Sequence, residues 1–338
     1  MSIAPLEKRP THKALPLLRS EVSRITHRRF YRVLAVVLLA AIAVISLIVF
    51  LVHSKTPQPV SEAEVQATSE RMIRGWERCL ERLPAEDAEQ ACGQRPSVED
   101  LDPYELGPND RYKGYEYIPI TLIGVAVAAG GVAFLIGASS GGAEWSSRSM
   151  TLQLLYEPRR LRLLVIKWLG LLIAVISLAA VAMVVAVAFA AITTSLRGTW
   201  DSTLAPVDEL REHFWQTLSI MGLRGLLLVA VAATIGYAIA MLVRNTGASL
   251  GVAFVYFVVV ENGIRIALMR YGTEPFILST NAVASIFPGG LEVPGAQGRR
   301  GEFVNVQLTN LRATGTMLFY TALISIPAVW SFTRRDVS

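Results

Sequence analysis

The sequence predicts an all-α membrane protein with six transmembrane helices, and composition and segment length carry this prediction. Apolar residues make up 52% of the 338 residues and charged residues 17%, and the mean hydropathy is +0.44. Soluble domains contain about 25% charged residues, so an ordinary soluble domain is excluded. A helix needs roughly 20 apolar residues to cross a hydrocarbon core about 30 Å thick. Six segments are that long: residues 33–53, 117–138, 163–194, 221–243, 247–268 and 313–333.

Basic residues are concentrated in the segments on one side of these spans. This side comprises residues 1–32, 139–162 and 334–338, with Lys167 and Arg244. It carries 16 basic and 5 acidic residues, whereas the other side carries 14 basic and 21 acidic residues. Cytoplasmic segments of membrane proteins are enriched in Lys and Arg, so we expect both termini in the cytoplasm of a cell-membrane protein. The same bias explains the pI near 9.3 without a nucleic-acid partner. The opposite side then holds residues 54–116, residues 195–220 and, as an extracytoplasmic or re-entrant segment, residues 269–312.

Residues 54–116 are expected to form a small helical domain outside the membrane. Apolar residues recur there at helical spacing, namely Met72, Ile73, Trp76, Cys79, Leu80 and Leu83. Cys79 and Cys92 are the only cysteines of the chain, and disulfides persist on the oxidising side of a membrane. We therefore expect a Cys79–Cys92 disulfide. The alternative is two unpaired thiols, because this spacing matches no metal site.

No catalytic or metal site is expected. The sequence from Gly137 to Gly141 matches the G-x-S-x-G pattern of a hydrolase nucleophile, but no histidine with an orienting acid is expected beside Ser139. The chain contains neither a G-x-x-x-x-G-K-[ST] phosphate-binding loop nor an H-E-x-x-H metal motif. We therefore expect a non-enzymatic chain that binds no cofactor itself.

The fifth span contains the polar residues Glu261, Asn262 and Arg265. Glu261 and Arg265 are four residues apart, so they share one face of an α-helix and can pair. Ionisable groups within a membrane are costly unless they pair or face a wet cavity. Two interpretations stay open: the three residues belong to a transport path or gate, or the pair is structural and Arg265 extends towards the membrane surface.

The segment between the second and third spans carries several short motifs in a distinctive order. Glu144 begins Glu-Trp-Ser-Ser, and Leu154, Pro158, Arg160 and Lys167 follow at intervals. This order resembles the coupling region of ABC-2 type transporter permeases. The basic, amphipathic residues 14–29 are similar to the helix that precedes the first span in that family. Arg148 departs from the resemblance, because many members have glycine there.

The resemblance implies the membrane-spanning subunit of an ATP-driven exporter of a lipid, peptide or drug-like substrate. A cytoplasmic coupling helix would cover about residues 143–156, and its ATPase-coupling residues would be Glu144, Trp145, Arg148, Leu154, Pro158 and Arg160. ATP and magnesium would bind to a separate ABC ATP-binding subunit. Further partners would be a second permease copy or a homologous permease, and the lipid bilayer. The main alternative is a signalling or envelope-assembly scaffold that acts through its extracytoplasmic domain, and an intramembrane enzyme is the third.

The orientation can be tested by labelling single cysteines in intact cells. In a background carrying Cys79→Ser and Cys92→Ser, Ser61→Cys should react with a membrane-impermeant thiol reagent, because residues 54–116 are expected outside. Ser149→Cys should react only after the membrane is permeabilised. Labelling of the second variant in intact cells would overturn the orientation.

Overall fold

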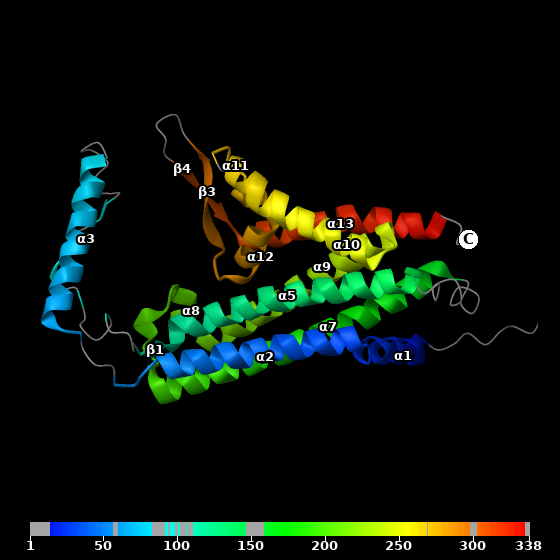
Figure 1. The fold of residues 1–338 in the computed structure, drawn as a ribbon, viewed down its shortest axis with the longest axis horizontal. Coiled ribbons are helices and arrows are strands. Elements are labelled where there is room, and N and C mark those ends of the chain that lie inside the picture. The colour runs from blue at the N-terminus through cyan, green and yellow to red at the C-terminus, as the bar shows by residue number, and fades with distance from the viewer. Residues whose placement is uncertain are drawn as a thin grey trace, which may run out of the picture. The chain divides into compact units, whose positions relative to one another are not determined.

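The protein is mostly helical, and six of its described helices are long and apolar enough to cross a membrane (Figure 1). The structure is a computed structural model that describes residues 14–56, 60–82, 92–93, 95–98, 101, 106, 111–146, 159–268, 270–297 and 303–334. The prediction of six potential spanning helices is confirmed. They are α2 (Arg29–Val52), α5 (Gly114–Ser146), α7 (Arg160–Arg197), α9 (Phe214–Val243), the composite helix Thr246–Leu268 and α13 (Asn310–Arg334).

Two of these helices are longer than a membrane requires. α5 has 33 residues and α7 has 38. At about 1.5 Å per residue they measure roughly 50 and 57 Å, whereas the hydrocarbon core is about 30 Å thick. To cross a bilayer, both helices would have to tilt strongly or extend beyond it. The residues just after the expected second span belong to the last turns of α5.

The chain folds into two compact units. The larger unit contains residues 1–42, 119–187 and 207–338, and the smaller contains residues 43–118 and 188–206. In the larger unit, the short helix α1 (Ala14–Thr26) precedes α2, and α9 is the most extensively buried of the six long helices.

Glycines bring α5 and α9 into close backbone contact. A Cβ atom added at Gly137 would lie 2.3 Å from the Ala233 carbonyl oxygen, and one added at Gly236 would lie 2.3 Å from the Phe134 carbonyl oxygen. Small residues allow this approach, which is common between helices in membranes. Any larger side chain at either glycine would push the two helices apart.

The fifth long helix is composite. It consists of α10 (Thr246–Val255), the π-helix η3 (Tyr256–Ile264) and α11 (Arg265–Leu268). Two short helices follow in the chain, η4 (Glu274–Phe276) and α12 (Leu278–Ile286). α12 lies within residues 269–312, which were expected to be extracytoplasmic or re-entrant.

The expectation of an all-α fold is wrong in that same segment. Strands β3 (Leu291–Gln297) and β4 (Phe303–Leu308) form an antiparallel pair in which Leu291 is opposite Leu308 and Val293 opposite Val306. These four side chains pack against Ala284 and Ala313 in one apolar cluster. The alternation of apolar and polar residues in each strand is the local signal for this structure, and the helical interpretation overlooked it.

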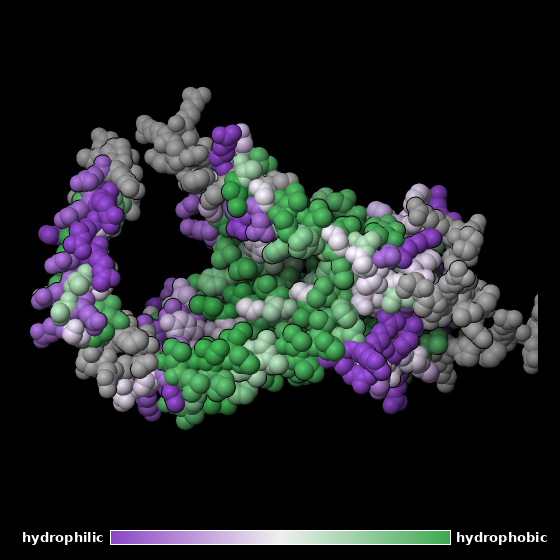
Figure 2. Space-filling view, in the orientation of Figure 1, coloured by the Kyte–Doolittle hydropathy of each residue, from purple (hydrophilic) through white to green (hydrophobic). Residues whose placement is uncertain are grey.

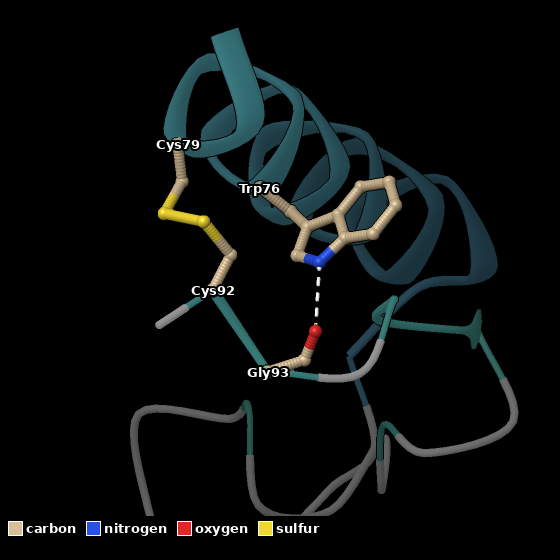
Figure 3. The surroundings of a disulfide bond; sticks show 4 residues. All are labelled: Trp76, Cys79, Cys92 and Gly93. Carbon is tan, nitrogen blue, oxygen red and sulfur yellow. Dashed lines mark hydrogen bonds between the residues drawn. A yellow bond between two sulfur atoms is a disulfide. The ribbon is translucent and has the colours of Figure 1, made fainter. Parts of the chain in front are cut away.

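The smaller unit contains the helix α3 (Glu62–Arg82) and the expected disulfide (Figure 3). Cys79 and Cys92 are bonded, with their Cα atoms 5.9 Å apart, which confirms the predicted bridge. Beside it, the Trp76 indole N–H donates to the Gly93 carbonyl oxygen at 3.1 Å. Gly93 has a left-handed φ of 66°, a conformation that glycine adopts without strain. Leu83, the last residue of the predicted helical pattern, lies outside the described residues.

Two further pairs of segments meet in the smaller unit. β1 (Tyr112–Lys113) and β2 (Gly198–Thr199) form a short parallel pair. The Arg197 guanidinium lies 4.2 Å from the centre of the Phe50 ring and donates to the His53 carbonyl oxygen at 3.0 Å. The end of α7 is therefore attached to the end of α2 within this unit. Two short helices precede α9 in the chain: η2 (Ser202–Leu204) and α8 (Asp208–Glu212).

The disulfide should stabilise the contact between α3 and the chain around Cys92. Its cysteines are 13 positions apart, and closing a loop of about 15 residues contributes about 3 kcal/mol in the chain-entropy estimate. The double substitution Cys79→Ser and Cys92→Ser should lower hydrogen-exchange protection of α3 by about that free energy. A reducing agent should have the same effect on the wild type and none on the double variant. Alkylation of both thiols without prior reduction would contradict the bridge.

Candidate functional site

Five charged side chains form a cluster that joins α1 to the end of α5 and the beginning of α7. They are Glu21 and Arg24 of α1, Arg28 between α1 and α2, Glu144 of α5 and Lys167 of α7. The Lys167 ammonium lies 3.0 Å from a Glu144 carboxylate oxygen and 3.4 Å from one of Glu21. The Arg24 guanidinium pairs with Glu144 and lies 2.6 Å from Glu21, and Arg28 lies 3.7 Å from Glu144. We call this set the junction cluster.

The centre of the junction cluster is withdrawn from solvent. The side chains of Lys167 and Glu144 are 2% and 4% exposed. Removing such charges from water costs several kcal/mol per ion, so each has to be paired and hydrogen-bonded. Burial lowers the pKa of Arg24, but the charges of Glu144 and Glu21 outweigh burial and leave that pKa raised. The carboxylates thus keep the arginine firmly charged inside the cluster.

The cluster carries one excess positive charge, because it contains three basic and two acidic groups. Burial and the neighbouring Arg24 together lower the pKa of Arg28, although Glu144 acts in the opposite direction. Arg24 Nε and Arg28 Nη1 are buried and have no hydrogen-bond acceptor among the described residues. These two N–H groups of the cluster therefore donate no hydrogen bond to the described residues.

Glu144 stands in the last turn of α5, which corrects its expected position at the start of a separate coupling helix. A carboxylate at a helix C-terminus opposes the helix dipole, and here Lys167 and Arg24 offset that cost. α5 continues this far because its small residues pack closely. A Cβ atom at Gly142 would lie 2.3 Å from Thr246 Oγ1, and one at Gly141 would lie 3.2 Å from the Tyr237 carbonyl oxygen.

Trp145, the next residue, also faces the bundle. Its indole N–H donates to the Met241 sulfur at 3.4 Å, and its ring meets the Phe332 ring edge-on at 6.3 Å. The Arg244 guanidinium lies 4.3 Å from the centre of the Trp145 ring. Trp145 therefore connects α5 with the ends of α9 and α13.

Arg160 begins α7 and lies against the end of α13. Its Nη1 atom is 3.5 Å from the Phe332 carbonyl oxygen and 3.4 Å from that of Thr333. A cation at this position stabilises the last carbonyls of a helix and its dipole. The structure thus brings Glu144, Trp145 and Arg160 to one end of the helix bundle. The other predicted coupling residues, Arg148, Leu154 and Pro158, lie outside the described residues.

Sequence reasoning missed the contribution of α1 to this site. The sequence places Glu21 and Arg24 only in a basic amphipathic segment, yet Arg24 pairs with Glu144 and Glu21 pairs with Lys167. A signal was present, since Glu21 is an isolated acidic residue among basic ones and stands three positions before Arg24. Its partner Lys167 is 146 residues away and could not be identified from local spacing.

The predicted ion pair between Glu261 and Arg265 is wrong. Arg265 Nε instead lies 2.7 Å from a carboxylate oxygen of Glu274, which is buried. Residues 256–264 form a π-helix, and Arg265 and Glu261 find their partners in the short helices that follow it, η4 and α12. Asn262, on the same turn, is exposed and donates to the Phe257 carbonyl oxygen at 2.8 Å.

Glu261 is buried and is held by the beginning of α12. It accepts hydrogen bonds from the backbone N–H groups of Leu278 at 3.1 Å and Ser279 at 3.4 Å, from the Ser279 hydroxyl, and from the Tyr256 hydroxyl at 2.9 Å. A helix N-terminus is a favourable position for a carboxylate. Glu261 therefore fastens the π-helix to α12.

Comparison with known proteins assigns the chain to a family whose function is unknown. Residues 102–338 match the family described as "Protein of unknown function (DUF2705)". The match spans more than half of the chain and includes Glu144 and Lys167, whereas Glu21, Arg24 and Arg28 precede it. Neither the curated proteins nor the solved structures contain a significant match.

The junction cluster should dominate the stability of this end of the bundle. Glu144→Gln leaves Lys167 and Arg24 undercompensated and should lower the free energy of unfolding by about 3–5 kcal/mol. Adding Lys167→Met should recover part of this loss, because the buried cation is then absent as well. Both effects can be measured by denaturant unfolding of the purified protein in detergent.

The matched control is Glu70→Gln, which removes an exposed ion pair with Arg74 on α3. Exposed pairs contribute at most about 1 kcal/mol, so this variant should remain close to the wild type. If Glu144→Gln is no more destabilising than Glu70→Gln, the cluster does not hold the helix ends together.

Proposed function

The chain belongs to the DUF2705 family, and we propose that it is the membrane-spanning subunit of an ABC-2 type transporter that exports its substrate. The observation that carries the proposal is the junction cluster. It ties α1, α5 and α7 together at the two ends of residues 147–158, which belong to the region 139–162 whose sequence resembles the coupling region of ABC-2 permeases. A transport subunit driven from outside the membrane needs such a mechanical connection.

The contacts around the cluster explain how a force on that segment would spread. Before it, Trp145 packs on Met241 of α9 and Phe332 of α13; after it, Arg160 binds the last carbonyls of α13. The Glu144 and Lys167 pair adds α1 through Glu21. Displacement of the segment would therefore move the ends of several helices together, as a rigid-body transition requires.

The surface of the long helices fits a subunit surrounded by lipid and other membrane helices. Figure 2 shows apolar side chains over α2 and α5. On α2, Val36 is 65% and Ile45 61% exposed, and on α10 Phe254 is 68% exposed. We assign these faces to the bilayer and to a second permease copy or a homologous permease. ATP and magnesium would bind to the separate ATP-binding subunit, and the hydrolysis step would occur there.

The proposal is tested by copurification with an affinity-tagged ABC ATP-binding subunit encoded beside the gene. The wild-type chain should be recovered with the ATPase and should change its rate of ATP hydrolysis. Arg148→Glu, in the proposed contact segment, should reduce recovery about fivefold, because an exposed ion pair contributes up to about 1 kcal/mol. Arg312→Glu, an equal charge change at the other end of α13, should have no effect. If the wild-type chain neither recovers nor stimulates an ATPase, the proposal fails and the scaffold interpretation takes its place.

A further inference from the structure

The side of α1 that faces away from the junction cluster carries positive charge and no negative charge. Its exposed residues follow one another at intervals of four positions, which places them along one side of the helix: Leu15, Arg19, Ser23 and His27. Glu21 is the only acidic residue among residues 14–52, and its side chain is 13% exposed and pairs with Lys167 in the cluster. No carboxylate of α1 or α2 therefore offsets the charge of this side.

Two more exposed arginines, Arg29 and Arg32, continue the charge onto the first turn of α2. The Arg32 guanidinium donates to the His27 carbonyl oxygen at 2.9 Å, which attaches it to the end of α1. The guanidinium groups of Arg19 and Arg29 form no ion pair with another described residue. We call the set Arg19, His27, Arg29 and Arg32 the basic surface.

The basic surface lies where the exposed apolar surface of α2 begins. Phe30, between Arg29 and Arg32, is 42% exposed, and Val33 is 58% exposed. Figure 2 shows hydrophilic side chains over α1 beside apolar side chains over α2. Where α2 crosses a bilayer, its exposed apolar side chains face lipid acyl chains, and the cations just before them lie in the layer of lipid headgroups.

The junction cluster adds a reason to expect an anion at this place. The cluster contains three basic and two acidic groups, and Arg28 is its most loosely held cation, 3.7 Å from Glu144. The Arg28 side chain is 27% exposed and precedes Arg29 directly, so an anion at the basic surface can approach it. Such an anion would supply the negative charge that the cluster lacks.

We propose that the basic surface binds the headgroup of an anionic phospholipid. Arg19, Arg29 and Arg32 attract its net negative charge, whereas a zwitterionic headgroup brings a cation of its own. Leu15, which is 77% exposed, and Phe30 favour a lipid over a soluble acidic partner, because apolar side chains beside cations enter the boundary between headgroups and acyl chains. The lipid would hold α1 from outside while the ion pairs hold it from inside. This binding does not depend on the proposed ATPase, so its test is independent of the transport assignment.

The test is native mass spectrometry of the full chain in detergent, titrated with phosphatidylglycerol and with phosphatidylcholine of identical acyl chains. One basic residue contributes about fivefold in affinity for an anionic lipid, so the wild type should prefer phosphatidylglycerol at least about tenfold. The triple variant Arg19→Gln, Arg29→Gln and Arg32→Gln should bind phosphatidylglycerol at least about tenfold more weakly and phosphatidylcholine unchanged. Replacement of the same three residues by lysine keeps the charges and should preserve the preference.

The matched control removes three exposed arginines from α3, through Arg71→Gln, Arg74→Gln and Arg78→Gln. It changes the net charge equally and should keep the preference of the wild type. Hydrogen exchange should place the lipid, because phosphatidylglycerol should slow exchange in α1 and leave α3 unchanged.

Three outcomes would overturn the proposal. They are equal binding of the two lipids by the wild type, an equal loss of phosphatidylglycerol in the α3 variant, and displacement of the lipid by polyglutamate, which would indicate a soluble acidic partner. If the triple variant does not fold, Arg19→Gln and Arg29→Gln decide singly, each with an expected loss of about fivefold.

Discussion

A buried ammonium group, that of Lys167, is the constraint on which one end of this protein depends. An ammonium that is 2% exposed cannot remain charged without close carboxylates, and α7 supplies none within reach. Glu144 arrives from α5 and Glu21 from α1. Because Lys167 has to be paired with carboxylates, its contacts with Glu144 and Glu21 fix the positions of the end of α5 and of α1. α5 ends and α7 begins beside that fixed point.

The sequence predicted correctly those features that depend on residues close together in the chain. A membrane of roughly constant thickness imposes a minimum apolar length, and the six long helices satisfy it. The two cysteines lie close together in the chain, on a segment with helical spacing, so their bridge required little knowledge of the fold. The motif around Glu144 and Trp145 likewise drew attention to residues that the structure brings together with Arg160.

The features that the sequence did not predict depend on contacts between distant segments. The resemblance placed Glu144 in a separate coupling helix, whereas Gly141 and Gly142 pack against α9 and Thr246 and belong, like Glu144, to a continuous α5. Arg265 pairs with Glu274 of the next short helix, and Glu261 finds its partners at the start of α12. A crevice lined by α7, α9 and α13 likewise cannot be predicted from the sequence of any one of these helices.

The two kinds of helix contact in the larger unit differ in how they would accommodate movement. α5 and α9 approach so closely at Gly137 and Gly236 that a single methyl group would collide with backbone, so they form one stiff pair. α9 and α13 are separated in part by a crevice of 240 Å³, also lined by α7, where packing is incomplete. Under the proposed function, a force delivered near Trp145 would shift α13 and α7 relative to that pair.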